Sequence, residues 1–255
     1  MAVKYKAVSR MKTFLKSLPF LGSHSSGIGK LRWRYHCWKV DPTRRLRGIL
    51  KDRDGLFVVQ IGSNDGLTGD PIHSLLRENP SWKALLIEPV PFLFERLKQN
   101  YAHNKNARFE NVAVTRAAGT TAFHYVDPAA KQHNPDLPEW FDQLGSFDRG
   151  HIVRQLGTAL EPYIVSDEIP TLPLAAVLER NEVSRIDVLH IDTEGFDWEI
   201  LQQLDLSRFR PAAILFEHKH LAESDKRAAV AFLEGAYRIS DLDVSGDFLC
   251  ERLPE

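Results

Sequence analysis

The chain has 255 residues, of which 43% are hydrophobic and 26% are charged, values that are ordinary for a soluble globular protein. This length allows one substantial α/β core with an appendage. The apolar runs fall short of the roughly 20 residues that span a membrane, and the two cysteines, Cys37 and Cys250, are too few for a disulfide framework. We therefore expect a protein of the reducing cytoplasm, with peripheral attachment to a membrane surface as the alternative.

Charge divides the chain into two parts. Residues 1–54 hold 14 lysines and arginines but three acids, a net charge of +11, whereas residues 55–255 carry −12. A basic arm on an acidic domain predicts that the arm contacts an anionic substrate, a membrane surface or the domain itself. Residues 2–18 have the pattern of a basic amphipathic helix, and residues 22–29 have linker composition. The aromatic and basic cluster at 31–38 is expected to cap the sheet near the active site.

From residue 57 onward, short apolar segments alternate with amphipathic ones, which predicts a Rossmann-like, doubly wound and mainly parallel α/β sheet. Strands are predicted at 57–61, 84–87, 108–114, 186–191 and 212–216, with a closing pair at 237–239 and 248–250 and an added hairpin or edge strand at 120–126. Helices are predicted at 41–50, 71–76, 91–101, 174–183, 196–204 and 222–233. Residues 127–170 contain several prolines and no sustained period, so we expect an irregular insertion that serves as a substrate lid.

A glycine loop follows the first predicted strand. Gly62, Ser63, Asn64, Asp65 and Gly66 separate that strand from a helical pattern. Backbone N–H groups of such a loop can approach a ligand at the start of a helix, at the carboxyl edge of the sheet. The loop alone fits a plain tight turn equally well.

Glu88 favours a binding loop over a plain turn. It ends the second predicted strand, 22 positions after Gly66, close to the offset of about 20 at which an acid accepts hydrogen bonds from ribose hydroxyls. The alternative is a solvated acid at a strand end. Because the third glycine of the dinucleotide motif is missing, a nucleoside without a diphosphate fits better, and this predicts S-adenosylmethionine.

Acidic side chains follow two further predicted strands. Asp192 and Glu194 come after the fourth strand, and Gly195 permits the turn into the next helix. Two carboxylates at this edge can position a substrate hydroxyl, act as a general base or bind a cation. The alternative for Glu194 is an electrostatic role at the helix N-terminus. Glu217 and His218 follow the fifth strand and are expected at the same edge.

Four segments together resemble the FkbM family. They are Gln60–Gly66 (QIGSNDG), Ile87–Pro89 (IEP), Asn111–Val114 (NVAV) and Ile191–Glu199 (IDTEGFDWE). The resemblance covers roughly residues 55–220, so residues 1–54 form an arm outside it and residues 55–255 form the expected catalytic domain. It implies the class I methyltransferase fold and an S-adenosylmethionine-dependent enzyme, and many members of the family act on hydroxyls of sugars and polyketides.

The resemblance also implies a cofactor site. The glycine loop would line the methionine portion, Glu88 the ribose, and residues 111–112 the adenine. The expected cofactor-binding residues are Gln60, Gly62, Ser63, Asn64, Asp65, Gly66, Glu88, Pro89, Asn111, Val112, Ala113 and Asp192. Many methyltransferases have an acid at the position of Gln60, and this departure leaves the partner of the cofactor's amino group open.

We therefore predict an O-methyltransferase whose acceptor is a hydroxyl of a sugar, a glycan or a small-molecule natural product. Its expected catalytic residues are Asp192, Glu194 and His218. Asp192 and Glu217 resemble the acids that hold Mg²⁺ in metal-dependent O-methyltransferases, although a metal-free site with His218 as base is favoured. One alternative is nucleic-acid methylation, which the cluster at 31–38 suggests but no base-methylation motif supports. Another is a non-enzymatic binding protein on the same fold.

Overall fold

The computed structural model describes residues 27–138 and 140–254. The basic helix predicted at 2–18 and most of the linker predicted at 22–29 lie outside these residues. The last three residues of that linker instead open a helix, α2 (Gly27–Val40). None of the described helices is long and apolar enough to cross a membrane.

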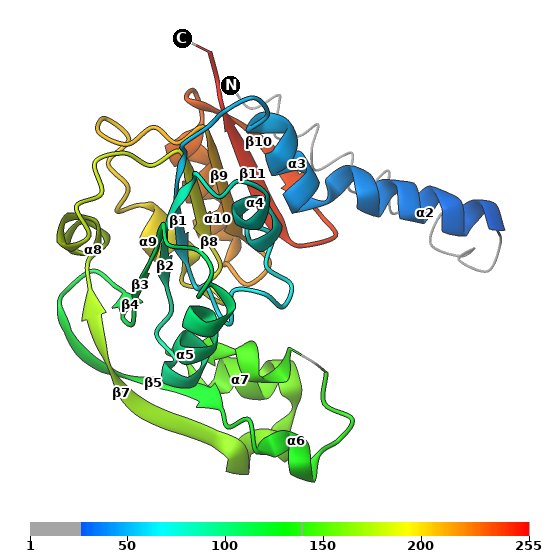
Figure 1. The fold of residues 1–255 in the computed structure, drawn as a ribbon. Helices are drawn as coiled ribbons and strands as arrows, with labels where there is room; N and C mark the ends of the chain where they lie inside the picture. Colours follow the sequence, from blue (N-terminus) through cyan, green and yellow to red (C-terminus); the bar gives the residue numbers. More distant parts are fainter. Residues whose placement is uncertain (1–26, 139, 255) are drawn as a thin grey trace.

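The main sheet has seven strands and is mostly parallel (Figure 1). In spatial order the strands are β10 (Tyr237–Leu242), β11 (Asp247–Arg252), β9 (Ala213–Glu217), β8 (Val188–Ile191), β1 (Phe57–Ile61), β2 (Lys83–Ile87) and β3 (Ala107–Glu110). Strand β11 runs antiparallel to both of its neighbours, and the other pairings are parallel. The chain order reverses between β1 and β8, so the crevice at the carboxyl ends of these two strands is the expected ligand position.

Both faces of this sheet are buried, which explains the nearly continuous apolar runs of its central strands. One face packs against α8 (Leu174–Arg180), α9 (Asp197–Leu201) and α10 (Glu223–Leu233). The other packs against α3 (Pro42–Ile49), α4 (His73–Glu78) and α5 (Pro91–Asn100). Figure 1 shows α8 on one side of the strands and α3 and α4 on the other. The doubly wound α/β fold expected from the sequence is therefore present.

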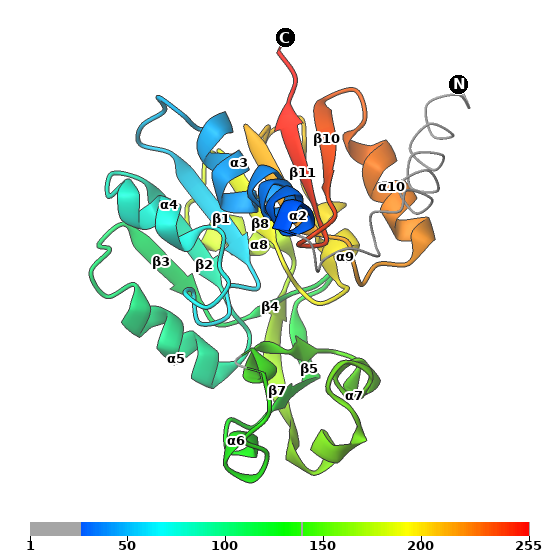
Figure 2. The same ribbon diagram turned by 90° about the vertical axis from the view of Figure 1, so that its right-hand side faces the viewer.

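A second, four-stranded sheet lies below the carboxyl edge of the first (Figures 1 and 2). Its strands, in spatial order, are β4 (Ala113–Val114), β7 (Ile164–Leu172), β5 (Gly119–Val126) and β6 (Gly145–Ser146). Between β5 and β7 the chain also forms α6 (Ala130–His133), α7 (Arg149–Leu156) and two 3₁₀ helices, at Phe141–Gln143 and Thr158–Tyr163.

Two predictions are wrong in this region. The strand predicted at 108–114 is two strands, β3 and β4, which belong to different sheets. The segment 127–170 is not irregular, because its last residues pair with the whole length of β5, from Gly119↔Thr171 to Val126↔Ile164. Its role as a lid stays a prediction.

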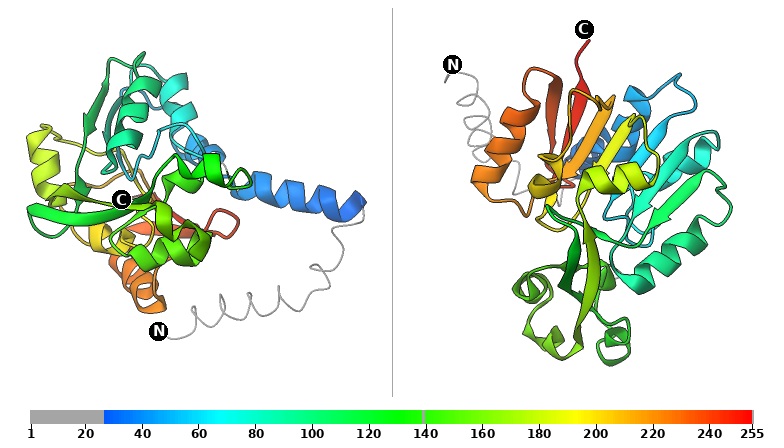
Figure 3. Two further views of the ribbon diagram at one scale, coloured as in Figure 1. Left: turned by 90° about the horizontal axis from the view of Figure 1, so that it is seen from below. Right: turned by 90° about the vertical axis from the view of Figure 1, so that its left-hand side faces the viewer.

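Helix α2 extends away from the body of the protein (Figure 3). Its side chains Trp33, Tyr35 and Trp38 are exposed, so the expectation that the cluster at 31–38 caps the sheet is wrong. The helix is fixed at its end by two contacts. His36 Nε2 lies 3.0 Å from Asp243 Oδ1 in the β10–β11 turn, and the Arg44 guanidinium lies 3.4 Å from the Trp38 ring centroid.

Gly66 is required by packing. It has a left-handed backbone (φ 67°), and a Cβ there would lie 2.6 Å from Tyr101 Cε2 and closer still to Leu97 Cδ1. Both of these side chains come from the α5 region of the apolar layer. The glycine therefore lets the loop after β1 lie directly on that layer, whatever the loop binds.

We expect Gly66→Ala to lower the free energy of unfolding by about 2–4 kcal/mol, because left-handed strain and overpacking add. Gly69→Ala is the matched control, since Gly69 has a similar φ of 72° but open space around its Cβ position. It should cost only about 1–2 kcal/mol. Urea denaturation of the unliganded proteins measures both, and equal losses would contradict a packing role for Gly66.

Candidate functional site

The glycine loop crosses the sheet edge between β2 and β8. The backbone N–H groups of Gly62 and Ser63 both donate to the Ile87 carbonyl, at 3.0 Å each. On the other side, a Cβ at Gly62 would lie 2.8 Å from the carbonyl carbon of Asp192 and closer still to its oxygen. Only glycine fits this approach, which places the loop in direct contact with the residue that follows β8.

Two polar side chains of the loop shape its backbone. Ser63 is buried, and its Oγ donates to the Gln60 carbonyl at 3.3 Å and accepts the Ile87 N–H at 3.1 Å. Asp65 accepts from the backbone N–H groups of Leu67 and Thr68, at 2.9 and 2.8 Å. The side chains of both residues hold the turn, and their contact with a cofactor stays a prediction.

Glu88 is the buried acid at the end of β2. Only 2% of its surface is exposed, and its Oε2 and Oε1 accept the backbone N–H groups of Asn64 and Val90, at 2.8 and 2.9 Å. Asn64 has a left-handed backbone (φ 48°). Burial, with the charges of Asp192 and Asp65 adding to it, raises the pKa of Glu88 to about 7. The sequence alternative of a solvated acid is therefore wrong.

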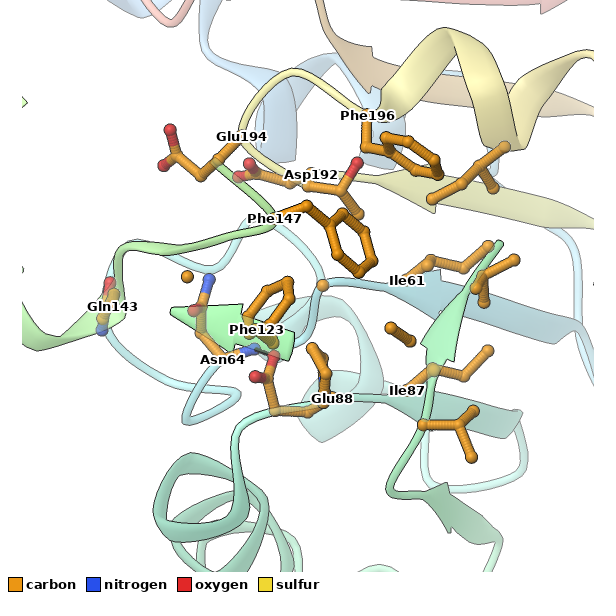
Figure 4. A pocket seen from close by; sticks show the side chains of 18 residues that line it. Ile61, Asn64, Ile87, Glu88, Phe123, Gln143, Phe147, Asp192, Glu194 and Phe196 are labelled. Carbon is orange, nitrogen blue, oxygen red and sulfur yellow. Dashed lines mark hydrogen bonds between the residues drawn. The ribbon is translucent and has the colours of Figure 1, made fainter. Parts of the chain in front are cut away.

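An apolar pocket opens beside Glu88 (Figure 4). The second sheet contributes Phe123 from β5 and the nearby Phe147, whose rings meet edge to face with centroids 5.0 Å apart. Phe147 also lies 5.0 Å from the Phe196 ring, which precedes α9. The remaining wall is formed by Ile61, Ile87, Pro89, Val112, Ala113, Val114 and Ile200.

A polar pocket continues from the apolar one. The two share Gly62, Asn64, Gln143, Asp192 and Glu194, so they adjoin along the carboxyl edge, and we call the two together the groove. The polar end is lined by Gln60, Ser63, Thr68, Gly69, Asp70, Pro71, Trp140, Leu144, Gln155, His190, Lys219 and His220. The groove therefore has an apolar end and a charged end that meet at Asp192.

Three carboxylates gather at that meeting point. Carboxylate oxygens of Asp192, Glu194 and Glu217 lie within 4.8 Å of one another, because β8 and β9 are parallel neighbours whose carboxyl ends coincide. Burial, followed by the charges of Glu194 and Asp247, raises the pKa of Asp192 to about 7. Burial and the charges of Asp192 and Glu194 likewise raise the pKa of Glu217 well above its ordinary range.

Glu194 remains ionised in this cluster. Its Oε2 lies 3.2 Å from His151 Nε2 and 3.1 Å from His220 Nε2. Although burial raises the pKa of Glu194, these two contacts lower it to about 2. Its backbone is left-handed (φ 54°), in a loop whose N–H groups at Thr193 and Gly195 are held by Asp197. Such backbone strain at a residue whose side chain lines a groove is typical of functional sites.

A model of the family described as the Methyltransferase FkbM domain matches residues 60–239. The chain belongs to the FkbM methyltransferase family. Its doubly wound, mostly parallel sheet agrees with the class I methyltransferase fold that the sequence resemblance implies. No curated protein sequence matches the chain.

Three solved structures that resemble this chain have low sequence identity to it. An FkbM methyltransferase from Methylobacillus flagellatus KT has 11% identity and a TM-score of 0.48, covering 78% of this chain and 44% of its own. A methyltransferase from Geobacter sulfurreducens has 13% identity and a TM-score of 0.43, with 96% of each chain covered. The fibrillarin pre-rRNA processing protein of Methanococcus jannaschii has 13% identity and a TM-score of 0.40, covering 80% and 68%. This chain thus spans less than half the length of the Methylobacillus protein.

Most of the site residues expected from the sequence line the groove of this FkbM methyltransferase. Those that line it are Gln60, Gly62, Ser63, Asn64, Glu88, Pro89, Val112, Ala113, Asp192 and Glu194. Asn111 instead donates to the carbonyls of Glu88 and Pro89, at 2.8 and 3.0 Å, and so supports the loop after β2. Gly66 faces α5, as described above.

His218 lies apart from the acid cluster. Its Nε2 is 3.1 Å from Asp241 Oδ1, and its ring stacks on Phe248 with centroids 4.0 Å apart. The expectation that it converges with Asp192 and Glu217 is therefore wrong. His220, two residues later, takes that place.

His151, Lys219 and His220 are the site residues that the sequence interpretation missed. His220 and Lys219 were visible only as neighbours of His218 in a polar run after β9, and side-chain direction in a loop does not follow from sequence spacing. His151 lies on α7, inside the segment that shows no clear pattern. No local signal pointed to its contact with Glu194, which is 43 residues away.

The raised pKa of Glu217 predicts a pH-dependent stability. A carboxyl group with a higher pKa in the folded than in the unfolded chain binds more protons when folded, so its contribution to stability falls as pH rises above the ordinary carboxyl range. As pH rises from 5 to 8, the unfolding free energy of the wild type should therefore fall by about 1–3 kcal/mol relative to that of Glu217→Gln.

Urea denaturation at a series of pH values measures this difference between the two unfolding free energies. Glu95→Gln is the control, because Glu95 is exposed and pairs only with Lys98 on its own helix among the described contacts. Its difference from the wild type should stay constant with pH. Parallel pH profiles for Glu217→Gln and the wild type would contradict the proton uptake.

Proposed function

We propose that this FkbM methyltransferase uses S-adenosylmethionine to methylate a hydroxyl group of a sugar, a glycan or a small-molecule natural product. The observation that carries the proposal is that the apolar pocket and the polar pocket adjoin. An apolar slot beside a buried acid, Glu88, leads directly to a cluster of titratable groups around Asp192. The groove can therefore hold a nucleoside beside Glu88 and a reacting hydroxyl next to it, at Asp192.

The residues present fit an adenosine in the apolar end. Val112, Phe123 and Phe147 offer apolar surfaces of the kind that bind a flat base. The Glu88 carboxylate uses one lone pair of each oxygen for the N–H groups of Asn64 and Val90, and the remaining lone pairs can accept from two ribose hydroxyls. A ribose held at Glu88 leaves the rest of the cofactor beside Asn64 and Gly62, where the two pockets join.

Asp192 is the proposed general base. When bound, the cofactor supplies a methyl group already activated by the positive charge on its sulfur. The chain must then hold the acceptor oxygen in line with that methyl group and accept the hydroxyl proton. A base with a pKa near 7 suits this task at neutral pH, and the pKa of Asp192 is raised to about that value.

Glu194 and the two imidazoles tune this base. Ionised Glu194 is the largest neighbouring charge that raises the pKa of Asp192. His151 and His220 hold Glu194 in place, and Gln155 Nε2 lies 3.3 Å from the other ring nitrogen of His220. Removing Glu194 should therefore lower the pKa of the base rather than remove the base.

The walls beyond Asp192 suit a polyhydroxylated acceptor. Trp140 presents an exposed indole, and Gln155, Lys219 and His220 present polar groups to the same pocket. A few convergent polar groups beside an aromatic surface are typical of a small-molecule site. This arrangement favours a sugar-like or small-molecule hydroxyl over a nucleic acid.

A bound divalent cation is an alternative way to balance the negative charge of the three carboxylates. Asp192, Glu194 and Glu217 present oxygens close enough to share one ion, and Glu217 Oε2 is buried without a hydrogen-bond partner. Against this, the Lys219 ammonium already pairs with the other Glu217 oxygen. We therefore favour a metal-free site, in which a chelator leaves turnover unchanged.

S-adenosylhomocysteine, the demethylated product, tests the cofactor assignment by isothermal titration calorimetry. We expect micromolar or tighter binding by the wild type, and a loss of about 1–3 kcal/mol, or roughly 5- to 150-fold in affinity, in Glu88→Gln. Glu95→Gln, an exposed acid on α5, is the control and should bind as the wild type does. Failure of the wild type to bind at millimolar ligand would contradict the proposed cofactor.

Transfer of a labelled methyl group tests the reaction. With S-adenosylmethionine labelled on its methyl group, we expect label in hydroxylated glycosides or macrolides rather than in RNA, whether or not EDTA is present. With the best acceptor, kcat should rise with pH through about 7, where Asp192 loses its proton, and Asp192→Asn should lower kcat by more than tenfold. Label found only in RNA, or full activity in Asp192→Asn, would contradict the proposal.

A further inference from the structure

Gln60 and Asp70 form a buried polar pair at the charged end of the groove. Gln60, in β1, is 1% exposed and lies beside His190 of β8 in the sheet register. Asp70 comes from the loop that precedes α4. The Gln60 Nε2 donates to Asp70 Oδ1 at 3.2 Å, and the Ile72 backbone N–H donates to the same oxygen at 2.7 Å.

Each member of this pair keeps one acceptor atom without a partner. Gln60 Oε1 and Asp70 Oδ2 are both buried, and neither accepts a hydrogen bond from the residues that the structure describes. An unsatisfied buried acceptor costs about 1–3 kcal/mol, and most such atoms in folded proteins have a partner. Two of them on adjacent side chains that line one pocket indicate a missing donor.

Capping of α4 does not explain the pair. Asp70 does hold the N-terminal side of that helix, but the contacts with Ile72 and Gln60 both use Oδ1. Oδ2 therefore has no structural task. Gln60 stands between Val59 and Ile61 in an otherwise apolar strand, FVVQI, so packing within that strand does not require its amide group.

The described side chains around the pair that can carry a positive charge already have other partners. His73, whose charge acts on Asp70, has its Nδ1 2.7 Å from the Gly66 carbonyl oxygen. His190 Nδ1 also lacks a hydrogen-bond partner, and burial lowers the pKa of His190 to about 4, so this imidazole is neutral at pH 7. The Lys219 ammonium, which lines the same pocket, pairs with Glu217. The donor that fits one carboxylate oxygen and one amide oxygen is a compact ammonium group with several N–H bonds.

We propose that Asp70 and Gln60 bind the α-ammonium group of the cofactor's methionine portion, so that Asp70 supplies the acid that β1 lacks. This inference rests on the proposed function. It is consistent with the order of groups along the groove, in which Glu88 lies at the apolar end and Asn64 and Gly62 lie between. A ligand with its ribose at Glu88 then extends its amino-acid portion toward Asp70.

Two ligands that differ in the amino-acid portion test the assignment. S-adenosylhomocysteine carries the ammonium group, whereas 5′-methylthioadenosine keeps the adenine, ribose and sulfur but lacks it. Calorimetry at pH 7.5 with Asp70→Asn should show S-adenosylhomocysteine bound at least tenfold more weakly than by the wild type. Binding of 5′-methylthioadenosine should change by less than twofold, which also shows that the variant is folded.

Two further variants complete the experiment. Gln60→Met removes the other acceptor and should likewise weaken only S-adenosylhomocysteine, by at least threefold. Glu78→Gln, which removes an exposed acid at the end of α4 that pairs with Arg47, should change neither affinity.

The outcomes separate this inference from the proposed function. If the wild type binds both ligands but Asp70→Asn and Gln60→Met leave S-adenosylhomocysteine unaffected, the ammonium assignment is wrong and the cofactor assignment stands. If either variant weakens both ligands equally, the pair supports the loop and does not contact the ammonium. If the wild type binds neither ligand, the proposed function fails and the inference fails with it.

Discussion

The contact between Gly62 and Asp192 is the constraint on which the rest of the site depends. The loop after β1 and the loop after β8 touch so closely that a methyl group at Gly62 would overlap the Asp192 backbone. This contact fixes the glycine loop above the switch point of the sheet, where the chain order reverses. It also brings Glu88, which holds the Asn64 N–H, to the same edge as the acids that follow β8 and β9.

The second sheet turns that edge into a groove. Strand β5 and the turn after β6 place Phe123 and Phe147 over the apolar end (Figure 4). Helix α7 brings His151 to Glu194. Burial raises the pKa of Asp192, whereas the contacts with His151 and His220 lower the pKa of Glu194 despite its burial, so the two values separate. Acids whose environments push their pKa values apart in this way are suited to different tasks in proton transfer.

The sequence predicted the main sheet well, since parallel strands buried on both faces appear as short apolar runs, as in residues 57–61 and 213–217. The second sheet was missed because β7 alternates only weakly and pairs with a strand some 40 residues earlier. At the site, Glu88 and Asp192 could be placed because they directly follow strands. The contributions of His151, His220 and Asp70 depend on loop geometry and on atoms left without partners, which only the three-dimensional structure provides.

A crystal structure of the complex with S-adenosylhomocysteine tests the central claim most directly. The account predicts the adenine against Val112 and Phe123, both ribose hydroxyls on the Glu88 carboxylate, and the sulfur on the Gly62 side of Asp192. It also predicts hydrogen bonds of about 2.7–3.2 Å from the ligand ammonium to Asp70 and Gln60. A ligand that binds outside this groove, or whose ribose does not contact Glu88, would contradict the account.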